Sequence, residues 1–169
     1  MAPSPRRAIY PGTFDPPHRG HLDLIRRGRA IVDELVVAVA ENRDKAPAFS
    51  VEDRVRFLER IVAPIAGVRV IAFDGLVVDL YREVGASFLL RGIRTFADFE
   101  AEYTMALTNR ALSGGTAGSD DLPAETIFVL PSLEFSHYSS RHVKEIASFG
   151  GDVRGFLPPE IAEEVASRM

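Results

Sequence analysis

The chain contains five short runs of apolar residues, and residues that favour turns bound each run. The runs cover residues 8–10, 35–40, 68–73, 88–90 and 127–130. Their apolar character is continuous rather than alternating, which is typical of strands buried on both faces of a sheet. The sequence therefore predicts five buried strands.

Segments with helical spacing lie between these runs and after them. In residues 51–62, apolar side chains recur every three or four positions and form one stripe along a helix. Ser50 and Asp53 predict a capping box at its start. The other helices that we expect cover approximately residues 20–32, 76–84, 97–112, 139–149 and the segment that follows Pro159.

Strand and helix alternate about five times, which favours an α/β fold. We expect a doubly wound, five-stranded parallel sheet with right-handed crossovers and helices on both faces. The length of 169 residues and the hydrophobic content of 46% fit one domain that spans residues 1–169. Residues 113–121 hold no large apolar side chain, so we interpret them as a flexible surface insertion.

The composition excludes several classes of function. A net charge of −4 is the wrong sign for a protein that binds nucleic acid through its phosphates. The absence of cysteine excludes disulfides, cysteine-ligated zinc, iron–sulfur clusters and thiol nucleophiles. We find neither a secretory signal nor an apolar run long enough to span a membrane, and we expect a cytoplasmic protein without a membrane partner.

Polar and basic residues follow the ends of the predicted strands. They are residues 11–21 after the first strand, Arg43 and Lys45 after the second, residues 91–94 after the fourth and residues 136–141 after the fifth. In open α/β sheets, ligands bind in the crevice outside the carboxyl ends of the strands. We therefore expect an anionic ligand at this edge of the sheet.

The stretch from His18 to His21 starts a predicted helix, where free backbone N–H groups and the helix dipole favour negative charge. Gly20 lets a phosphate or a purine approach the backbone closely. His18 and His21 are three positions apart and would face the same way. Imidazole can donate to a phosphoryl oxygen, with the Thr13 hydroxyl beside it, and phosphoryl transfer needs little more than positioning and electrostatics. The alternative is that both histidines are helix-cap or surface residues; a zinc pair is disfavoured because no third ligand has suitable spacing.

The other charged and hydroxyl residues each allow two interpretations. Lys45 could be a solvated surface charge, and so could Arg91 and Arg94, although an arginine fork directly after a strand suits phosphate. Glu102 could act as an acidic residue near a helix start or as an acceptor from ribose hydroxyls. Ser139–Ser140 could be an N-cap, an anion contact or both.

Residues 10–16, followed by Gly20-His21, resemble the signature of the nucleotidylyltransferase superfamily with its H-x-G-H motif. The bacterial phosphopantetheine adenylyltransferases specifically are what these motifs resemble: residues 91–94, 97–100 with Glu102, 109–110, 143–145, 151–153 and 156–158. The similarity covers nearly the whole chain apart from the insertion.

The resemblance implies a Rossmann-like nucleotidylyltransferase fold and an enzyme that transfers AMP from ATP to 4′-phosphopantetheine. The products would be dephospho-coenzyme A and pyrophosphate, formed by in-line attack. The resemblance also implies magnesium carried with ATP rather than by protein ligands, a homohexamer, and coenzyme A as a feedback inhibitor.

On this resemblance, the two substrates contact different residues except for Thr13, which would contact both. Catalysis would depend on Thr13, His21, Lys45 and Arg91. Phosphopantetheine would be bound by Thr13, Lys45, Val77, Arg91 and Asn109. ATP would be bound by Thr13, Phe14, His18, His21, Gly92, Ile93, Arg94, Glu102, Phe135, Ser136, His137, Tyr138, Ser139, Ser140 and Arg141.

A few positions depart from the family pattern. His18 stands where the family commonly has threonine, Ala101 replaces a usual tyrosine, and Arg141 adds a cation beside the expected triphosphate. The nearest alternative is a nicotinate mononucleotide adenylyltransferase, which shares the first motif. A different alternative is a non-catalytic sensor of nucleotides or coenzyme A built on the same fold.

Overall fold

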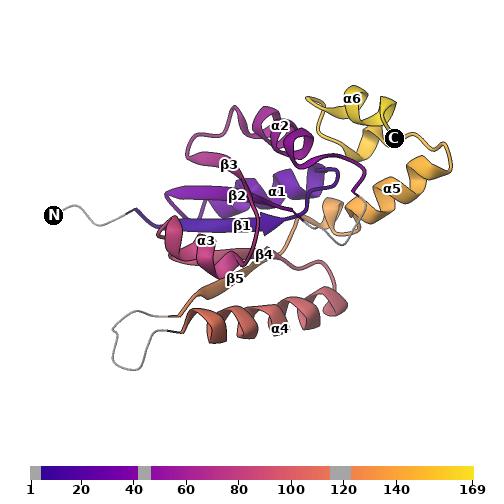
Figure 1. Ribbon diagram of the computed structural model, residues 1–169. Helices are drawn as coiled ribbons and strands as arrows, with labels where there is room; N and C mark the ends of the chain where they lie inside the picture. Colours follow the sequence, from indigo (N-terminus) through magenta and orange to yellow (C-terminus); the bar gives the residue numbers. More distant parts are fainter. Residues whose placement is uncertain (1–4, 42–46, 115–122) are drawn as a thin grey trace.

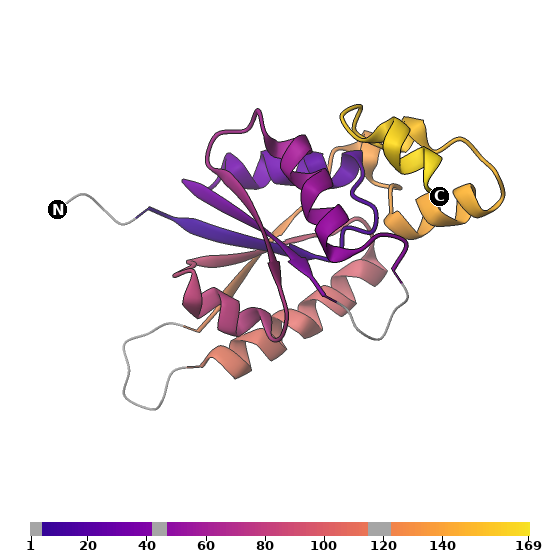
Figure 2. The ribbon, with the colours of Figure 1, turned by 45° about the horizontal axis from the view of Figure 1, so that its top comes forward.

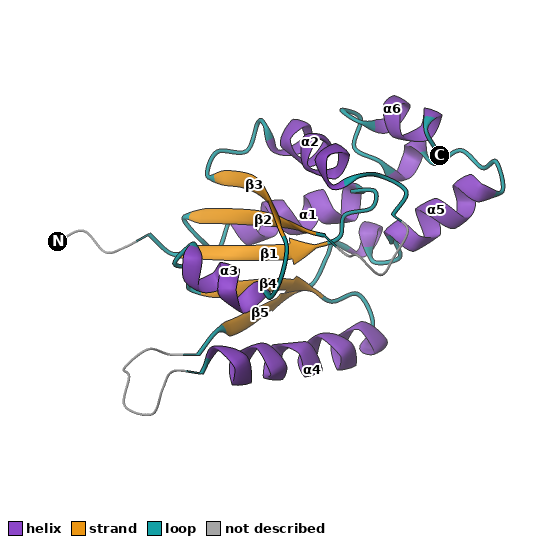
Figure 3. Cartoon of the chain, viewed as in Figure 1, coloured by secondary structure: helices purple, strands orange, loops and turns teal. Residues whose placement is uncertain are grey.

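The computed structural model of the protein describes residues 5–41, 47–114 and 123–169. In these ranges the chain forms one parallel sheet of five strands in the order β3-β2-β1-β4-β5 (Figure 3). The strands are β1 (Arg7–Gly12), β2 (Glu34–Ala40), β3 (Val68–Phe73), β4 (Phe88–Gly92) and β5 (Glu125–Val129). The predicted doubly wound α/β class is confirmed.

Helices cover both faces of the sheet, as expected (Figures 1 and 2). The helices α1 and α2 pack on one face, where the C-terminal helices also contribute to the core, while α3 packs on the other face and contacts α4. The α-helices are α1 (Arg19–Arg29), α2 (Val51–Val62), α3 (Val77–Glu83), α4 (Phe96–Ser113), α5 (Ser140–Ser148) and α6 (Ala162–Ser167), and two 3₁₀ turns are η1 (Leu133–Phe135) and η2 (Arg154–Phe156).

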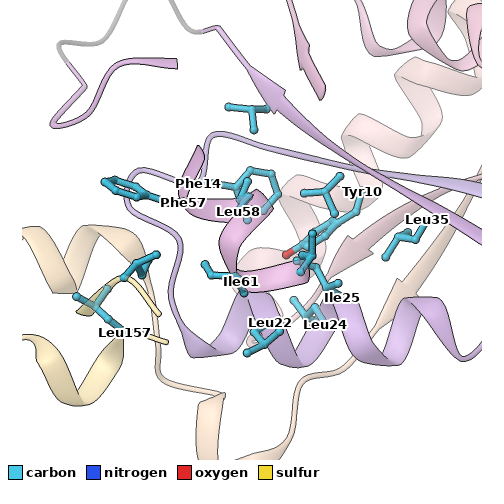
Figure 4. Close-up of a cluster of buried hydrophobic side chains, with 14 of the residues drawn as sticks. Tyr10, Phe14, Leu22, Leu24, Ile25, Leu35, Phe57, Leu58, Ile61 and Leu157 are labelled. Atoms are coloured by element: carbon cyan, nitrogen blue, oxygen red, sulfur yellow. The ribbon is translucent and has the colours of Figure 1, made fainter. Parts of the chain in front are cut away.

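The central strands contribute to two hydrophobic clusters. Along β1, Ala8 and Tyr10 join the cluster beneath α1 and α2, whereas Ile9 between them joins the cluster beneath α3. Successive side chains of a strand point to opposite faces, so a strand covered on both faces needs apolar residues at every position. Figure 4 shows the larger cluster, in which side chains of α1, α2 and the C-terminal segment meet those of the sheet.

Two details of the prediction are wrong. The strands β3 and β5 are not buried on both faces, because they form the edges of the sheet; Arg69 and Ala72 of β3 are exposed. The first helix was expected to reach residue 32 but ends at Arg29, because the chain turns there and Val32 enters the core. The helix over residues 51–62 has the predicted bounds, and Ser50 caps it by accepting from the Asp53 N–H.

The strand order places a crevice between β1 and β4. From β1 the chain continues to α1 on one face of the sheet, and from β4 it continues to α4, which packs with α3 beyond the other face. Loops that diverge in this way leave an opening at the carboxyl ends of the two strands.

Most of the predicted insertion, 113–121, lies outside the described residues. Within the described ranges, none of the helices is long and apolar enough to cross a membrane.

Candidate active site

A cleft of about 270 Å³ lies at the carboxyl ends of β1 and β4. The loop after β1, the start of α1, the loop after β4 and the segment from residue 131 to 140 surround it. It is lined by Tyr10, Pro11, Gly12, Thr13, Phe14, His18, Gly20, His21, Leu24, Arg91, Gly92, Arg94, Glu102, Pro131, Phe135, Tyr138, Ser139 and Ser140.

Side-chain to backbone hydrogen bonds hold these segments against one another. Arg94 donates to the Tyr138 carbonyl at 2.7 Å, which ties the loop after β4 to the segment before α5. The Ser140 hydroxyl donates to the Pro16 carbonyl at 2.8 Å, which ties the start of α5 to the loop after β1. Parts of the chain that are far apart in sequence therefore form one cleft.

The two histidines of the motif stack on each other. His18 is the N-cap of α1, and its ring lies 3.7 Å from the ring of His21, centroid to centroid, at an interplanar angle of 24°. The His18 backbone N–H donates to Nδ1 of His21 at 3.1 Å. Because Nδ1 accepts, the proton of the neutral His21 ring resides on Nε2. His21 therefore provides the cleft with a neutral N–H donor.

The surroundings keep both imidazoles uncharged near neutral pH. Burial lowers the pKa of His21 well below its ordinary value, and the neighbouring His18 and Arg94 side chains lower it further. Burial, helped by the charge of Arg94, also lowers the pKa of His18 to about 3. Nδ1 of His18 is buried and has no hydrogen-bond partner among the described residues. The electrostatic contribution of this pair is thus a hydrogen-bond donor rather than a fixed charge.

Arg91, at the end of β4, forms a two-pronged ion pair with Glu102 of α4. Its Nε and Nη2 each lie 2.6 Å from one carboxylate oxygen, and Nη1 donates to the Pro11 carbonyl at 2.6 Å. Burial acts to lower the pKa of Arg91, but the hydrogen bonds and the charge of Glu102 outweigh it and raise the pKa. A guanidinium has five N–H groups, so two remain for an anionic ligand.

The predicted site residues fall into three groups. Twelve of them line the cleft: Thr13, Phe14, His18, His21, Arg91, Gly92, Arg94, Glu102, Phe135, Tyr138, Ser139 and Ser140. Six others do not line it: Val77, Ile93, Asn109, Ser136, His137 and Arg141. The N–H of Ile93 donates to the Val129 carbonyl, Asn109 is buried in α4, and His137 and Arg141 are exposed. Lys45 and Arg43 lie outside the described residues.

The structure resolves one of the open alternatives. Ser139 is the N-cap of α5, since its hydroxyl accepts from the His142 N–H at 3.1 Å, and it also lines the cleft. Glu102 accepts from Arg91 through both of its oxygens, and each oxygen keeps a lone pair that could accept from a ribose hydroxyl.

The sequence reasoning missed two buried charged residues beside the cleft, Asp15 and Arg54. Asp15 stood inside the recognised motif without a role, and its side chain accepts from Lys144 and from two backbone N–H groups. Arg54 is 1% exposed. The available signal for Arg54 was an arginine within the apolar stripe of the predicted helix.

Glu102, which lines the cleft, and Asp98 and Asp15, which lie beside it, are engaged by basic side chains. Glu102 pairs with Arg91, Asp98 with Arg94, and Asp15 with Lys144. In the described ranges, His, Asp and Glu side chains do not gather in a group of three or more that could hold a metal ion. These residues do not offer Mg²⁺ a ready cage of oxygen ligands.

Comparisons with known proteins identify the class. The model of the cytidylyltransferase-like family matches residues 9–146, which include the central strands and the cleft. A lipopolysaccharide core biosynthesis protein from Thermoplasma volcanium shares the fold, with a TM-score of 0.53 at 20% identity over 76% of this chain and 98% of that one. The chain therefore belongs to the cytidylyltransferase-like family of nucleotidyltransferases, and the matched residues include the two stacked histidines at the first strand–helix turn.

Curated relatives narrow the family further. A phosphopantetheine adenylyltransferase of Lachnoclostridium phytofermentans is 48% identical over 93% of this chain and 91% of its own length. Enzymes of the same name from Aquifex aeolicus and Rhizorhabdus wittichii are each 42% identical, over 96% and 97% of this chain and 96% and 94% of their own lengths. The chain belongs to the phosphopantetheine adenylyltransferase family.

Proposed function

We propose that the protein transfers the AMP group of ATP to 4′-phosphopantetheine, forming dephospho-coenzyme A and pyrophosphate. The observation that carries this proposal is the convergence of Thr13, His21 and Arg91 on one cleft, in a chain similar to phosphopantetheine adenylyltransferases over nearly its whole length. The cleft offers a hydroxyl, a neutral imidazole donor and a guanidinium, which together suit phosphoryl groups.

The proposed reaction is one in-line displacement at the α-phosphorus of ATP. A phosphate oxygen of phosphopantetheine forms the new bond to this phosphorus, the bond to the β-phosphate oxygen breaks, and pyrophosphate leaves with the electron pair. The Nε2–H of His21 and the Thr13 hydroxyl would stabilise the negative charge that develops on the oxygens of the α-phosphoryl group during its transfer. Arg91 would hold the acceptor phosphate with its two remaining N–H groups. Lys45, to which we assign the same phosphate, lies outside the described residues.

We propose that Mg²⁺ enters with the phosphates of ATP. The engagement of Asp15, Asp98 and Glu102 by basic side chains supports this, because Mg²⁺ dehydrates reluctantly and is usually held by few carboxylates and substrate phosphates. When bound, the ion would neutralise charge on the leaving pyrophosphate.

The acceptor specificity tests the function. We expect the purified protein to release pyrophosphate from ATP with 4′-phosphopantetheine and not with nicotinate mononucleotide. Turnover with nicotinate mononucleotide alone would identify the alternative adenylyltransferase. Binding of ATP or coenzyme A without turnover of either acceptor would identify a sensor and refute the proposed activity.

We propose that the chain assembles as a homohexamer. The helix α4 supports this, because within it only Asn109 is buried, while Phe99, Tyr103 and Leu107, spaced four positions apart on one face, are exposed. Exposed apolar patches commonly mark protein–protein contacts.

Light scattering should therefore give a mass about six times the 18.6 kDa of one chain. The double variant Tyr103→Glu/Leu107→Glu should dissociate, because it places charge on this one face of α4. The variant Phe149→Glu, at an exposed position beyond α5, should not. A wild-type mass of one chain would overturn the proposal.

Two further properties belong to the proposal. Coenzyme A contains both an adenylate and a phosphopantetheine part, so it should compete for the cleft as a feedback inhibitor, and inhibition assays would check this. We place the reaction in the cytoplasm, the compartment that supplies ATP, and cell fractionation would check the location.

A further inference from the structure

We infer that Arg54 is a positioning residue for the proposed transfer reaction: its buried guanidinium holds the backbone of Thr13 in place against the end of β2 and the start of α2. The inference rests on the proposed function, and it adds a residue outside the cleft lining to the machinery of that reaction.

Arg54 joins three segments through backbone carbonyl groups. Its Nη1 donates to the Thr13 carbonyl at 2.6 Å and to the Ala40 carbonyl at 3.1 Å, and its Nε donates to the carbonyls of Phe49 at 3.1 Å and Ser50 at 3.3 Å. The side chain can reach them because helical side chains lean towards the N-terminus of their helix, and Arg54 stands in the first turns of α2. One side chain thus connects the loop after β1, the last residue of β2 and the cap of α2.

Packing alone does not explain an arginine at this position. Arg54 is 1% exposed, and in the described ranges its side chain donates to the backbone carbonyls of Thr13, Ala40, Phe49 and Ser50. Burial of the charge lowers the pKa of Arg54, an effect that Asp15 partly opposes. A buried charge is costly, and an apolar side chain of similar volume would fill the space at lower cost. What only the planar fork provides is simultaneous donation to several separate segments.

Asp15 also connects the loop after β1 with the segment that leads into α2, but as a hydrogen-bond acceptor rather than a donor. Its carboxylate accepts from the backbone N–H groups of Ala48 and Phe49, each at 3.0 Å, and from Lys144 at 2.9 Å. The backbone of Phe49 is therefore bound on both sides: its N–H donates to Asp15, and its carbonyl accepts from Arg54. The segment that leads into α2 is bound on both sides to the loop that carries Thr13.

The backbone between Thr13 and Asp15 also indicates a held conformation. Phe14 has a φ of +51°, in the left-handed region that residues other than glycine rarely adopt. Such a conformation costs free energy and persists only where the surroundings enforce it. Arg54 fixes the residue before Phe14, and the bonds of Asp15 fix the residue after it.

The consequence for the reaction passes through Thr13. Its side chain lines the cleft while Arg54 fixes its carbonyl, so the bond to Arg54 determines where the hydroxyl lies. A displacement of about 1 Å in a catalytic group can lower the rate by about a hundredfold. ATP would lose its contact with Thr13 but retain those on the loop after β4 and on residues 135–140, which Arg54 does not touch, so its binding should weaken less than that of phosphopantetheine.

Steady-state kinetics of the whole enzyme test the inference with Arg54→Met, which keeps the length of the side chain and removes the donors. We expect kcat to fall by about tenfold or more and the KM for phosphopantetheine to rise, with the KM for ATP within about threefold of wild type. Arg54→Lys should change the same parameters in the same direction by a smaller factor of at least about three, because an ammonium cannot span the carbonyls.

Arg60→Met is the matched control. Arg60 lies on the same helix and pairs with Glu164 at the surface, so this variant should lose some thermal stability and keep the kinetics of wild type. If Arg54→Met does not fold by circular dichroism, Arg54→Lys decides. A folded Arg54 variant with wild-type kcat and KM, or an equal loss in Arg60→Met, or a KM for ATP that rises as much as that for phosphopantetheine, would overturn the inference. A wild-type enzyme inactive with phosphopantetheine would instead refute the proposed function.

Discussion

The substitution His21→Ala is expected to lower kcat by about a hundredfold or more, about 2.7 kcal/mol of transition-state stabilisation, while the affinity for ATP changes little. The physical reason is the tautomer. Nδ1 of His21 accepts from the His18 N–H, so the neutral ring has its proton on Nε2, and this donor strengthens as charge develops on the transferred group. Stopped-flow or steady-state pyrophosphate release measures kcat, and calorimetry measures the binding of ATP.

The pH dependence of the wild-type enzyme tests whether His21 is neutral in the site. Because the pKa of His21 lies well below its ordinary value, this imidazole should not titrate between about pH 6 and 8, and the wild-type kcat should show no step from it there. The control is His142→Ala, at an exposed position on α5, which should behave as wild type. If His21→Ala keeps the wild-type kcat, the stabilising role assigned to His21 is wrong.

The substitution Arg91→Met is expected to lower kcat/KM for phosphopantetheine by about a hundredfold, mainly through KM. It removes the two N–H groups left for the acceptor phosphate, and it also leaves the carboxylate of Glu102 without its partner inside the cleft. The negative charge of Glu102, no longer neutralised by Arg91, then repels an anionic substrate. Kinetics with varied phosphopantetheine at saturating ATP would measure the loss.

A double-mutant cycle separates these two effects. Glu102→Gln alone should raise the KM for phosphopantetheine by a smaller factor, because Arg91 loses its support but keeps its charge. In the double variant the loss should be smaller than the sum of the two single losses in free energy. Arg69→Met breaks the ion pair between Arg69 of β3 and Glu34 of β2 and should not change the kinetics. Additive losses would show that Glu102 does not position Arg91.

The sequence predicted most of the elements because their signals are local. Continuous apolar runs identified the central strands, and the stripe over residues 51–62 identified α2 to the residue. The burial of the edge strands was less well predicted, because an apolar run such as those of β3 and β5 has the same sequence pattern whether helices cover one or both faces of the strand. Strand order, not composition, decides which strands are edges.

The candidate site was predicted as a set of residues rather than as an arrangement. The rule that ligands bind at the carboxyl ends of strands placed Thr13, His21 and Arg91 at one rim, and the structure gathers them there. The same reasoning treated Arg91 and Glu102 as contacts of two different ligands and did not predict that they also bind each other. Their partnership depends on the distance between β4 and α4, which no spacing in the sequence encodes.

The sequence by itself determined the alternation of strands and helices, the histidine turn at the start of α1 and the basic residues at the strand ends, because each of these depends on neighbours a few positions away. The tertiary structure alone decided the tautomer of His21, the pairing of Arg91 with Glu102 and the burial of Arg54 against Thr13. These features are contacts between segments that are brought together only when the sheet and its helices pack, and the free energy of burying polar groups then selects which donors and acceptors meet.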